Sequence, residues 1–198
     1  MDIELFYEFG SSYSYPAVMV ADREAQQRGH TLTHRPFFLG PLFVKQGLEQ
    51  PPFIKYPVKG AYMFRDLERI CAQLGLGWNK PTQFPRRAVL PTRLAIVGFD
   101  EGWGLRFAQR VFTLNFVDDR EIDDEANMRS VLQEVGVDAD DALAKAQTAT
   151  YKDKLRAQTA RAEELGLFGA PTFVVGRELF WGGDRMQQAF DWAERPWL

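Results

Sequence analysis

Three serines lie where a strand-like segment gives way to a helix-like one. Residues 9–16 read F-G-S-S-Y-S-Y-P, which places Ser11, Ser12 and Ser14 at that junction. A hydroxyl in front of a helix can cap it by accepting a backbone N–H. It can also donate a hydrogen bond to a bound group, where the positive end of the helix dipole favours a negative charge. Both roles stay open on residue type alone.

The other reactive residue types do not form an obvious site. Cys71 is the only cysteine, and apolar residues recur around it at helical spacing, so we expect a buried thiol and no internal disulfide. His30 and His34 have no cysteine or carboxylate arranged beside them in the sequence. Because a metal site needs several such ligands, we expect no metal.

Composition narrows the class of protein. The 198 residues are 45% hydrophobic and 26% charged with a net charge of −3, which is typical of a soluble globular protein and lacks the basic excess of a nucleic-acid binder. No apolar run approaches the roughly 20 residues that span a bilayer, and the start M-D-I-E-L-F does not resemble a signal peptide. We therefore expect a cytoplasmic protein without nucleic-acid or membrane partners. A homodimer is the expected assembly, since dimers are the commonest soluble oligomers.

Periodicity predicts an α/β fold with a helical middle. Alternation over residues 3–9 predicts a strand, a helix follows from about Tyr13, and residues 32–38 predict a second strand that pairs parallel to the first. Helical spacing then dominates, and strand character returns only at 172–175 and 178–181, before a last amphipathic helix. We predict a thioredoxin-like domain built from residues 1–39 and 166–198, and an all-helical insertion domain over residues 40–165.

Four stretches together resemble a known family. They are F-Y-E-F-G-S-S-Y-S-Y, K-G-A-Y-M-F-R-D-L-E-R, F-P-R-R and G-L-F-G-A-P-T-F-V-V-G-R-E-L-F-W-G-G-D-R. In this order they resemble the 2-hydroxychromene-2-carboxylate isomerases and the related kappa-class glutathione transferases, which implies a DsbA-like thioredoxin fold and glutathione as cofactor. Redox relatives carry Cys-x-x-Cys where this chain has residues 11–14. A hydroxyl cannot exchange with a disulfide, so dithiol oxidoreductase activity is excluded.

The resemblance assigns Ser11 as the catalytic hydroxyl, which would stabilise the thiolate of bound glutathione at the helix start. Ser12 stands where many relatives carry proline, and helix capping suits Ser12 or Ser14. The resemblance also implies a cis peptide before Pro171, with the backbone of Ala170 pairing with glutathione.

A second glutathione-binding segment is implied near the end of the chain. It consists of Trp181, Gly182, Gly183, Asp184 and Arg185. The charged pair Asp184 and Arg185 would meet the γ-glutamyl ammonium and carboxylate. Asp184 could also cap the last helix together with Gln187, and Trp181 could wall the site or fill the core.

The resemblance places the substrate side of the site in the helical insertion. Its predicted residues are Glu49, Lys59, Tyr62, Phe84 and Arg86, with Arg87 as the alternative to Arg86. Cations beside apolar walls suit an aromatic carboxylate, whereas Glu49 stands near a family asparagine and would repel an anion. We expect a glutathione-dependent cis/trans isomerase of 2-hydroxychromene-2-carboxylate or a similar compound in aromatic degradation. The alternatives are a kappa-like transferase or peroxidase and a non-catalytic thioredoxin-fold binding module.

Overall fold

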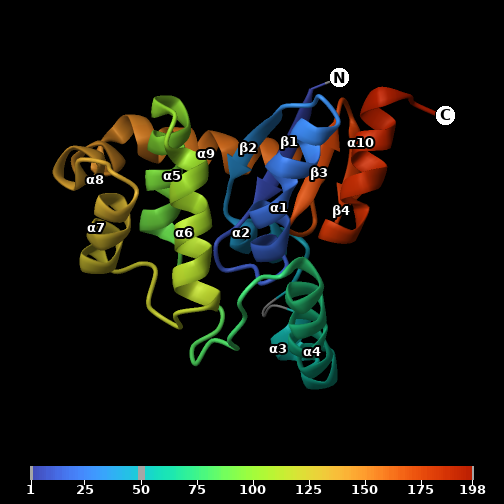
Figure 1. Cartoon of the computed structure of the whole chain (residues 1–198), viewed down its shortest axis with the longest axis horizontal. Helices are drawn as coiled ribbons and strands as arrows, with labels where there is room; N and C mark the ends of the chain where they lie inside the picture. Colours follow the sequence, from blue (N-terminus) through green and yellow to red (C-terminus); the bar gives the residue numbers. More distant parts are fainter. Residues whose placement is uncertain (1, 49–51, 198) are drawn as a thin grey trace.

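The computed structural model describes residues 2–48 and 52–197, and its centre is a four-stranded mixed sheet (Figure 1). The strands are β1 (Ile3–Tyr7), β2 (Leu32–Pro36), β3 (Thr172–Val175) and β4 (Glu178–Trp181), in the order β2-β1-β3-β4. β1 runs parallel to β2, with Ile3 opposite Leu32, and antiparallel to β3. The four predicted strands and the parallel pairing of the first two are confirmed, although β1 and β2 each end two residues before the predicted ends at 9 and 38.

Helices account for most of the rest of the chain. Before β3 they are α1 (Ser14–Gln27), α2 (Leu39–Lys45), α3 (Pro52–Lys55), α4 (Pro57–Leu74), α5 (Val89–Glu101), α6 (Gly104–Phe116), α7 (Glu125–Glu134), α8 (Ala139–Gln147) and α9 (Ala149–Glu164). After β4 come a short 3₁₀ helix, η1 (Gly183–Arg185), and α10 (Met186–Glu194). Within the described residues, every strand lies outside 40–165, as the periodicity predicted. None of the helices in the described ranges has both the length and the apolar character of a membrane span.

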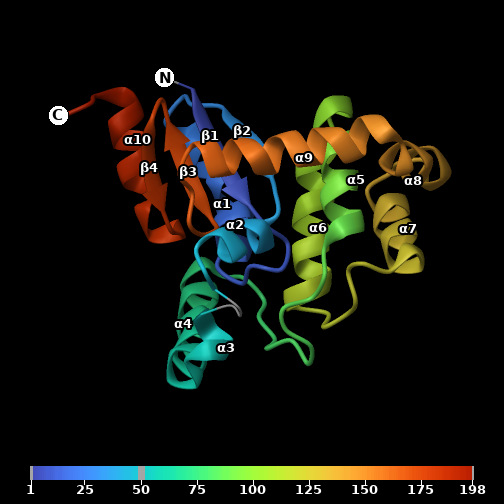
Figure 2. The same cartoon turned by 180° about the vertical axis from the view of Figure 1, so that it is seen from behind.

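The two faces of the sheet bury different helices because side chains alternate along each strand. Ile3, Leu5 and Tyr7 point into a large core shared with α1, α10 and the bundle around α6. Phe6 and Val174 point the other way, into a smaller core covered by α2 and the end of α9, which lie in front of the sheet in Figure 2. Both faces of the sheet are therefore covered by helices.

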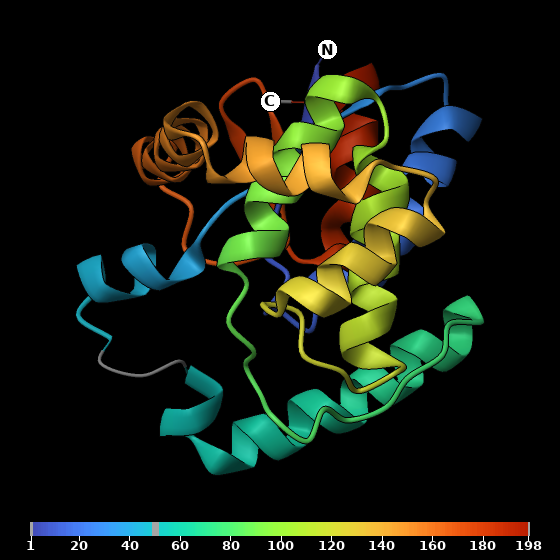
Figure 3. The same ribbon diagram turned by 90° about the vertical axis from the view of Figure 1, so that its left-hand side faces the viewer.

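Helices α3 and α4 lie beyond the carboxyl end of β1 (Figures 1 and 2). The serine loop, residues 8–13, begins there and leads into α1. α4 starts with Pro57 in its first turn and ends at Gly75, whose φ of 68° is the left-handed conformation that glycine adopts readily. Figure 3 shows the segment after α4 running back along that helix toward α5. One end of the sheet thus faces both α4 and this returning segment.

The predicted helix caps are wrong. The residue before α1 is Tyr13, and no side chain caps that helix. The Ser12 hydroxyl donates instead to the Met63 sulfur at 3.5 Å, and the Ser14 hydroxyl accepts from the Glu8 N–H at 3.5 Å. Asp184 does not cap the last helix either, because η1 intervenes and Arg185 occupies the position before α10. The Ser12 and Ser14 hydroxyls therefore bond to Met63 and Glu8 and not to the free N–H groups at the start of α1, where local propensity would place them.

Candidate active site

The Ser11 hydroxyl joins two segments that are far apart in the chain. Its Oγ donates to the Ala170 carbonyl at 2.9 Å, across 159 residues. The Ser11 backbone is held as well, since its N–H donates to the Glu8 carbonyl and its own carbonyl accepts from the Ser14 N–H, both at 3.1 Å. The predicted catalytic hydroxyl therefore has a fixed position at the start of α1.

The loop before β3, residues 165–171 and named the Ala170 loop, forms the opposite side of this contact. The Ala170–Pro171 peptide is cis, as the resemblance implied, and the Pro171 carbonyl accepts from the Gly182 N–H at 2.9 Å. Gly169 lies so close to Trp181 that an added Cβ would come within 2.3 Å of the indole nitrogen. Trp181 is 51% exposed and packs beside Phe168, with ring centroids 5.1 Å apart. Of the two roles considered for Trp181, core filling is wrong and a wall beside the Ala170 loop fits.

Asp184 and Arg185 present opposite charges next to this loop. Their side chains are 73% and 52% exposed, and their one ion pair among residues 2–48 and 52–197 is with each other, at 3.5 Å. Gly182 has a φ of 105° and lies against the Asp184 carboxylate, while Gly183 lies against Ala17 of α1. The 181–185 segment is thereby tied to α1 and to the Ala170 loop while its charges stay open to solvent.

Helix α4 contributes Asp66 and Arg69, two residues that the sequence did not single out. The Tyr13 hydroxyl donates to Asp66 Oδ2 at 3.0 Å, and the second Asp66 oxygen accepts from Arg69 at 2.8 Å. Burial and the Asp66 carboxylate raise the pKa of Tyr13. These contacts, with the one from Ser12 to Met63, fasten the serine loop to α4. No periodicity or motif signals a pairing across 53 residues.

The predicted substrate residues of α4 and the returning segment are distributed around this region. Lys59 and Tyr62 are exposed on α4, and the Tyr62 ring lies under the Arg69 guanidinium at 5.6 Å. Phe84 packs on Phe53 with ring centroids 4.7 Å apart, in a cluster that also includes rings from α4 and α6. Glu49 lies outside the described residues.

Arg86 is buried and already has partners. It donates to Asn115 Oδ1 at 2.8 Å and to Asp119 Oδ1 at 2.6 Å, while Asn115 Nδ2 donates to the Phe9 carbonyl at 2.9 Å. The Arg86 carbonyl lies 3.0 Å from where a Cβ of Gly10 would be. The arrangement makes Arg86 a brace between α6 and the start of the serine loop, and its contact with substrate stays a prediction.

Glu8 is a half-buried carboxyl at the start of the serine loop. Burial raises its pKa to about 7, although the N–H of Leu39, 3.3 Å from Oε1, partly opposes this. The strand alternation placed Glu8 on the less apolar side of β1 and could not show that α2 covers it. A carboxyl group with this pKa exchanges protons near neutral pH.

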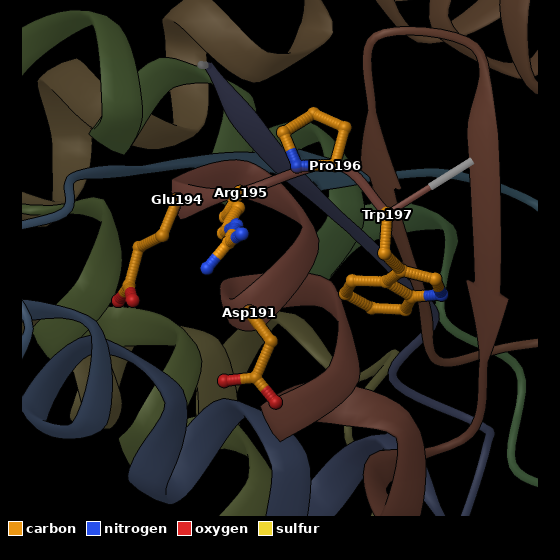
Figure 4. A pocket seen from close by; sticks show the side chains of 5 residues that line it. All are labelled: Asp191, Glu194, Arg195, Pro196 and Trp197. Carbon is orange, nitrogen blue, oxygen red and sulfur yellow. The ribbon is translucent and has the colours of Figure 1, made fainter.

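The remaining candidates lie elsewhere. Cys71 is buried, as predicted, and burial raises the pKa of its thiol to about 11. His34 is paired with Asp22 at 2.8 Å, and no group of three potential metal ligands occurs within the described ranges. A surface pocket of about 770 Å³ at the end of α10 contains none of the predicted site residues (Figure 4). Its lining consists of Asp191, Glu194, Arg195, Pro196 and Trp197.

Comparison with known proteins shows the family to which this chain belongs. Residues 2–191 match the model of the DSBA-like thioredoxin domain, and the chain belongs to that family. Among curated relatives, a 2-hydroxychromene-2-carboxylate isomerase of Sphingobium xenophagum is 26% identical over 195 residues, covering 93% of each chain. Glutathione S-transferase kappa 1 of Caenorhabditis elegans is 25% identical over 208 residues, covering 98% of this chain and 91% of its own. A solved 2-hydroxychromene-2-carboxylate isomerase superposes with a TM-score of 0.88 at 22% identity, covering 98% of this chain and 95% of the other. The resemblance in the sequence and the thioredoxin fold are confirmed.

Proposed function

We propose that this chain is a glutathione-dependent isomerase acting on 2-hydroxychromene-2-carboxylate or a similar aromatic carboxylate. The observation that carries the proposal is the Ser11 hydroxyl, held 2.9 Å from the Ala170 carbonyl in front of a helix that no side chain caps. A hydroxyl donor and a helix start together stabilise an anion. The two kinds of relative named above add support, since one is an isomerase and the other a glutathione transferase.

The residues present fit glutathione. Its γ-glutamyl end carries an ammonium and a carboxylate, and exposed Asp184 and Arg185 offer the complementary charges. Its cysteinyl residue needs backbone partners. Among the described residues, the one donor to the Ala170 carbonyl is the Ser11 side chain, which can turn away. Trp181, half-exposed beside Gly169, would cover one side of the peptide.

When bound, glutathione would supply a thiolate that adds reversibly to the electron-poor carbon of the substrate, so that a double bond becomes single and can rotate before elimination restores the thiolate. The Ser11 hydroxyl would turn from the Ala170 carbonyl to donate to the sulfur, which lowers the thiol pKa. Lys59, exposed and without an acidic partner among the described residues, would hold the substrate carboxylate. The ring of Phe84 would supply an apolar wall and exclude water.

Two alternative functions remain to be tested. A kappa-like transferase or peroxidase would bind glutathione at the same site, whereas a non-catalytic binding module would catalyse no reaction. In an isomerase glutathione is a catalyst, whereas a transferase or peroxidase consumes it. We expect the purified protein to convert many equivalents of 2-hydroxychromene-2-carboxylate per glutathione, with free thiol unchanged at the end. Loss of thiol in step with product would favour the transferase, and no conversion together with no glutathione binding would favour the binding module.

A further inference from the structure

A second cavity lies between α2, α5 and α9, elements seen together in Figure 2. Its volume is about 290 Å³, near the lower end of the range for small-molecule sites. Phe38, Pro41 and Leu155 form an apolar part of its lining, and Thr159 adds a hydroxyl that accepts from the Phe38 N–H at 3.2 Å. None of the residues assigned to the glutathione site lines this cavity.

Two cations face the cavity without a partner. Arg93 of α5 and Lys152 of α9 line it and are partly buried. Neither side chain makes a hydrogen bond or an ion pair with any residue of 2–48 or 52–197. The Nε of Arg93 is fully buried and has no acceptor. Because the Nε is covered, a ligand in the cavity would meet the terminal nitrogens of the Arg93 guanidinium, which are not buried and have no partner among the described residues. A cation held there without an anionic partner favours a ligand that supplies one.

The other charged groups of the lining are already neutralised. Arg156 pairs with Asp153 one turn earlier, and Glu163 accepts from Lys45 at 2.7 Å. The uncompensated charge of the cavity is therefore positive and comes from Arg93 and Lys152. The cavity combines that charge with an apolar wall on its α2 side.

We propose that this cavity is a binding site for a small organic carboxylate with an apolar body, separate from the glutathione site. The planar guanidinium of Arg93 matches a carboxylate in a two-point hydrogen bond, and Lys152 adds a point charge. Phe38, Pro41 and Leu155 take the apolar part of the ligand. A phosphate has no apolar part to place there, so the shape and charge of the lining favour a carboxylate.

The test is a titration with benzoate, followed by ¹H–¹⁵N NMR of the arginine Nε–H groups. We expect the Arg93 Nε–H signal and the amides of 38–41 and 152–160 to shift at millimolar benzoate. Benzamide has the same ring without the charge and should bind about tenfold more weakly or worse. The titration is carried out with glutathione saturating, so that changes at 11–13, 170–171 and 181–185 report the other site.

Three variants distinguish benzoate binding in this cavity from a nonspecific effect of surface charge. Arg93→Met and Lys152→Met should each weaken benzoate binding, the former by about tenfold or more. Arg106→Met is the matched control, because Arg106 is exposed on α6 outside the cavity, and it should leave the affinity unchanged. Circular dichroism verifies that each variant is folded. If Arg93→Met does not fold, the shift of the Arg93 Nε–H signal in the wild-type protein still tests the proposal.

Several results would overturn the proposal. They are an unmoved Arg93 Nε–H signal, equal affinity in the Arg93 and Arg106 variants, and shifts confined to the glutathione site. Binding of inorganic phosphate without binding of benzoate would overturn the assigned ligand class. Because the readout is binding at Arg93 and not turnover, a failed isomerase assay leaves this test intact.

Discussion

The Ser11 hydroxyl can donate to only one acceptor at a time, and its present acceptor is the Ala170 carbonyl. Transfer of that hydrogen bond to a thiolate is worth about 1.5–3 kcal/mol, or roughly 1–2 pKa units of the bound thiol. We predict that Ser11→Ala raises the pKa of bound glutathione by that amount, followed by thiolate absorbance. Turnover at neutral pH should fall roughly tenfold or more and recover partly at higher pH.

Ser12→Ala is the matched control, because the Ser12 hydroxyl is buried and donates to the Met63 sulfur. It should cost about 1 kcal/mol of stability or less and leave the thiolate titration in place. Exchange of the two phenotypes would make Ser12 the catalytic hydroxyl. An unchanged titration in both variants would mean that the helix start alone stabilises the thiolate.

Glu8 should make the stability of the protein depend on pH. Its pKa rises from 4.5 to about 7 on folding, so the folded state binds more protons than the unfolded state between these values. The contribution of Glu8 to the free energy of unfolding is then largest below pH 4.5, falls as the pH rises from about 4.5 to about 7, by up to about 3 kcal/mol, and is constant above that. Glu8→Gln should remove this fall, measured by urea unfolding from pH 5 to 8.

Glu178→Gln is the control for Glu8, since Glu178 is exposed on the edge strand β4. It should keep the wild-type pH dependence. Parallel pH profiles for wild type and Glu8→Gln would show that Glu8 ionises in the folded protein without the cost that its burial implies.

At the scale of elements, Asn115 joins α6 to the start of the serine loop, just after β1, and to the segment that follows α4. Its Nδ2 donates to the Phe9 carbonyl and its Oδ1 accepts from Arg86, and the side chain is buried. We predict that Asn115→Ala lowers the free energy of unfolding by about 2–4 kcal/mol, because Arg86 and the Phe9 carbonyl lose a buried partner. Denaturant unfolding measures it.

Asn79→Ala provides the comparison, because Asn79 is exposed and its side chain makes one bond, to the Val117 carbonyl. Its loss should cost about 1 kcal/mol or less. Equal losses for the two asparagines would refute the brace between α6 and the start of the serine loop.

At the scale of the whole molecule, glutathione should stabilise the folded chain because its proposed site joins α1, the Ala170 loop and the 181–185 segment. A ligand at about 100 times its Kd adds about 2.7 kcal/mol, which for this length is roughly 5–10 °C in Tm. We predict such a shift by calorimetry, and a smaller one for Asp184→Asn. Asp153→Asn, an exposed carboxylate away from the site, should behave as wild type. No shift at millimolar glutathione would support the binding module.

The strands, the parallel first pair and the helical middle could be predicted because they depend on local periodicity. β3 and β4 begin and end at the predicted residues, since a two-residue turn at Gly176 and Arg177 separates two short apolar runs. The motif residues near Ser11 and Pro171 could likewise be named, because the resemblance rests on their order in the chain.

Only the tertiary structure decided which partner each polar group takes. Ser12 and Ser14 are good caps by local propensity, yet Ser12 donates to Met63 and Ser14 accepts from Glu8. No local signal encodes the contact between Ser12 and Met63, which are 51 residues apart. The partial burial of Glu8 depends on α2, whose Leu39 N–H donates to it, and the bracing role of Arg86 depends on α6. The sequence alone determined the order of the elements and the residue types at the site, because both are local. The hydrogen-bond partners, the burial and therefore the pKa values came from packing between distant segments.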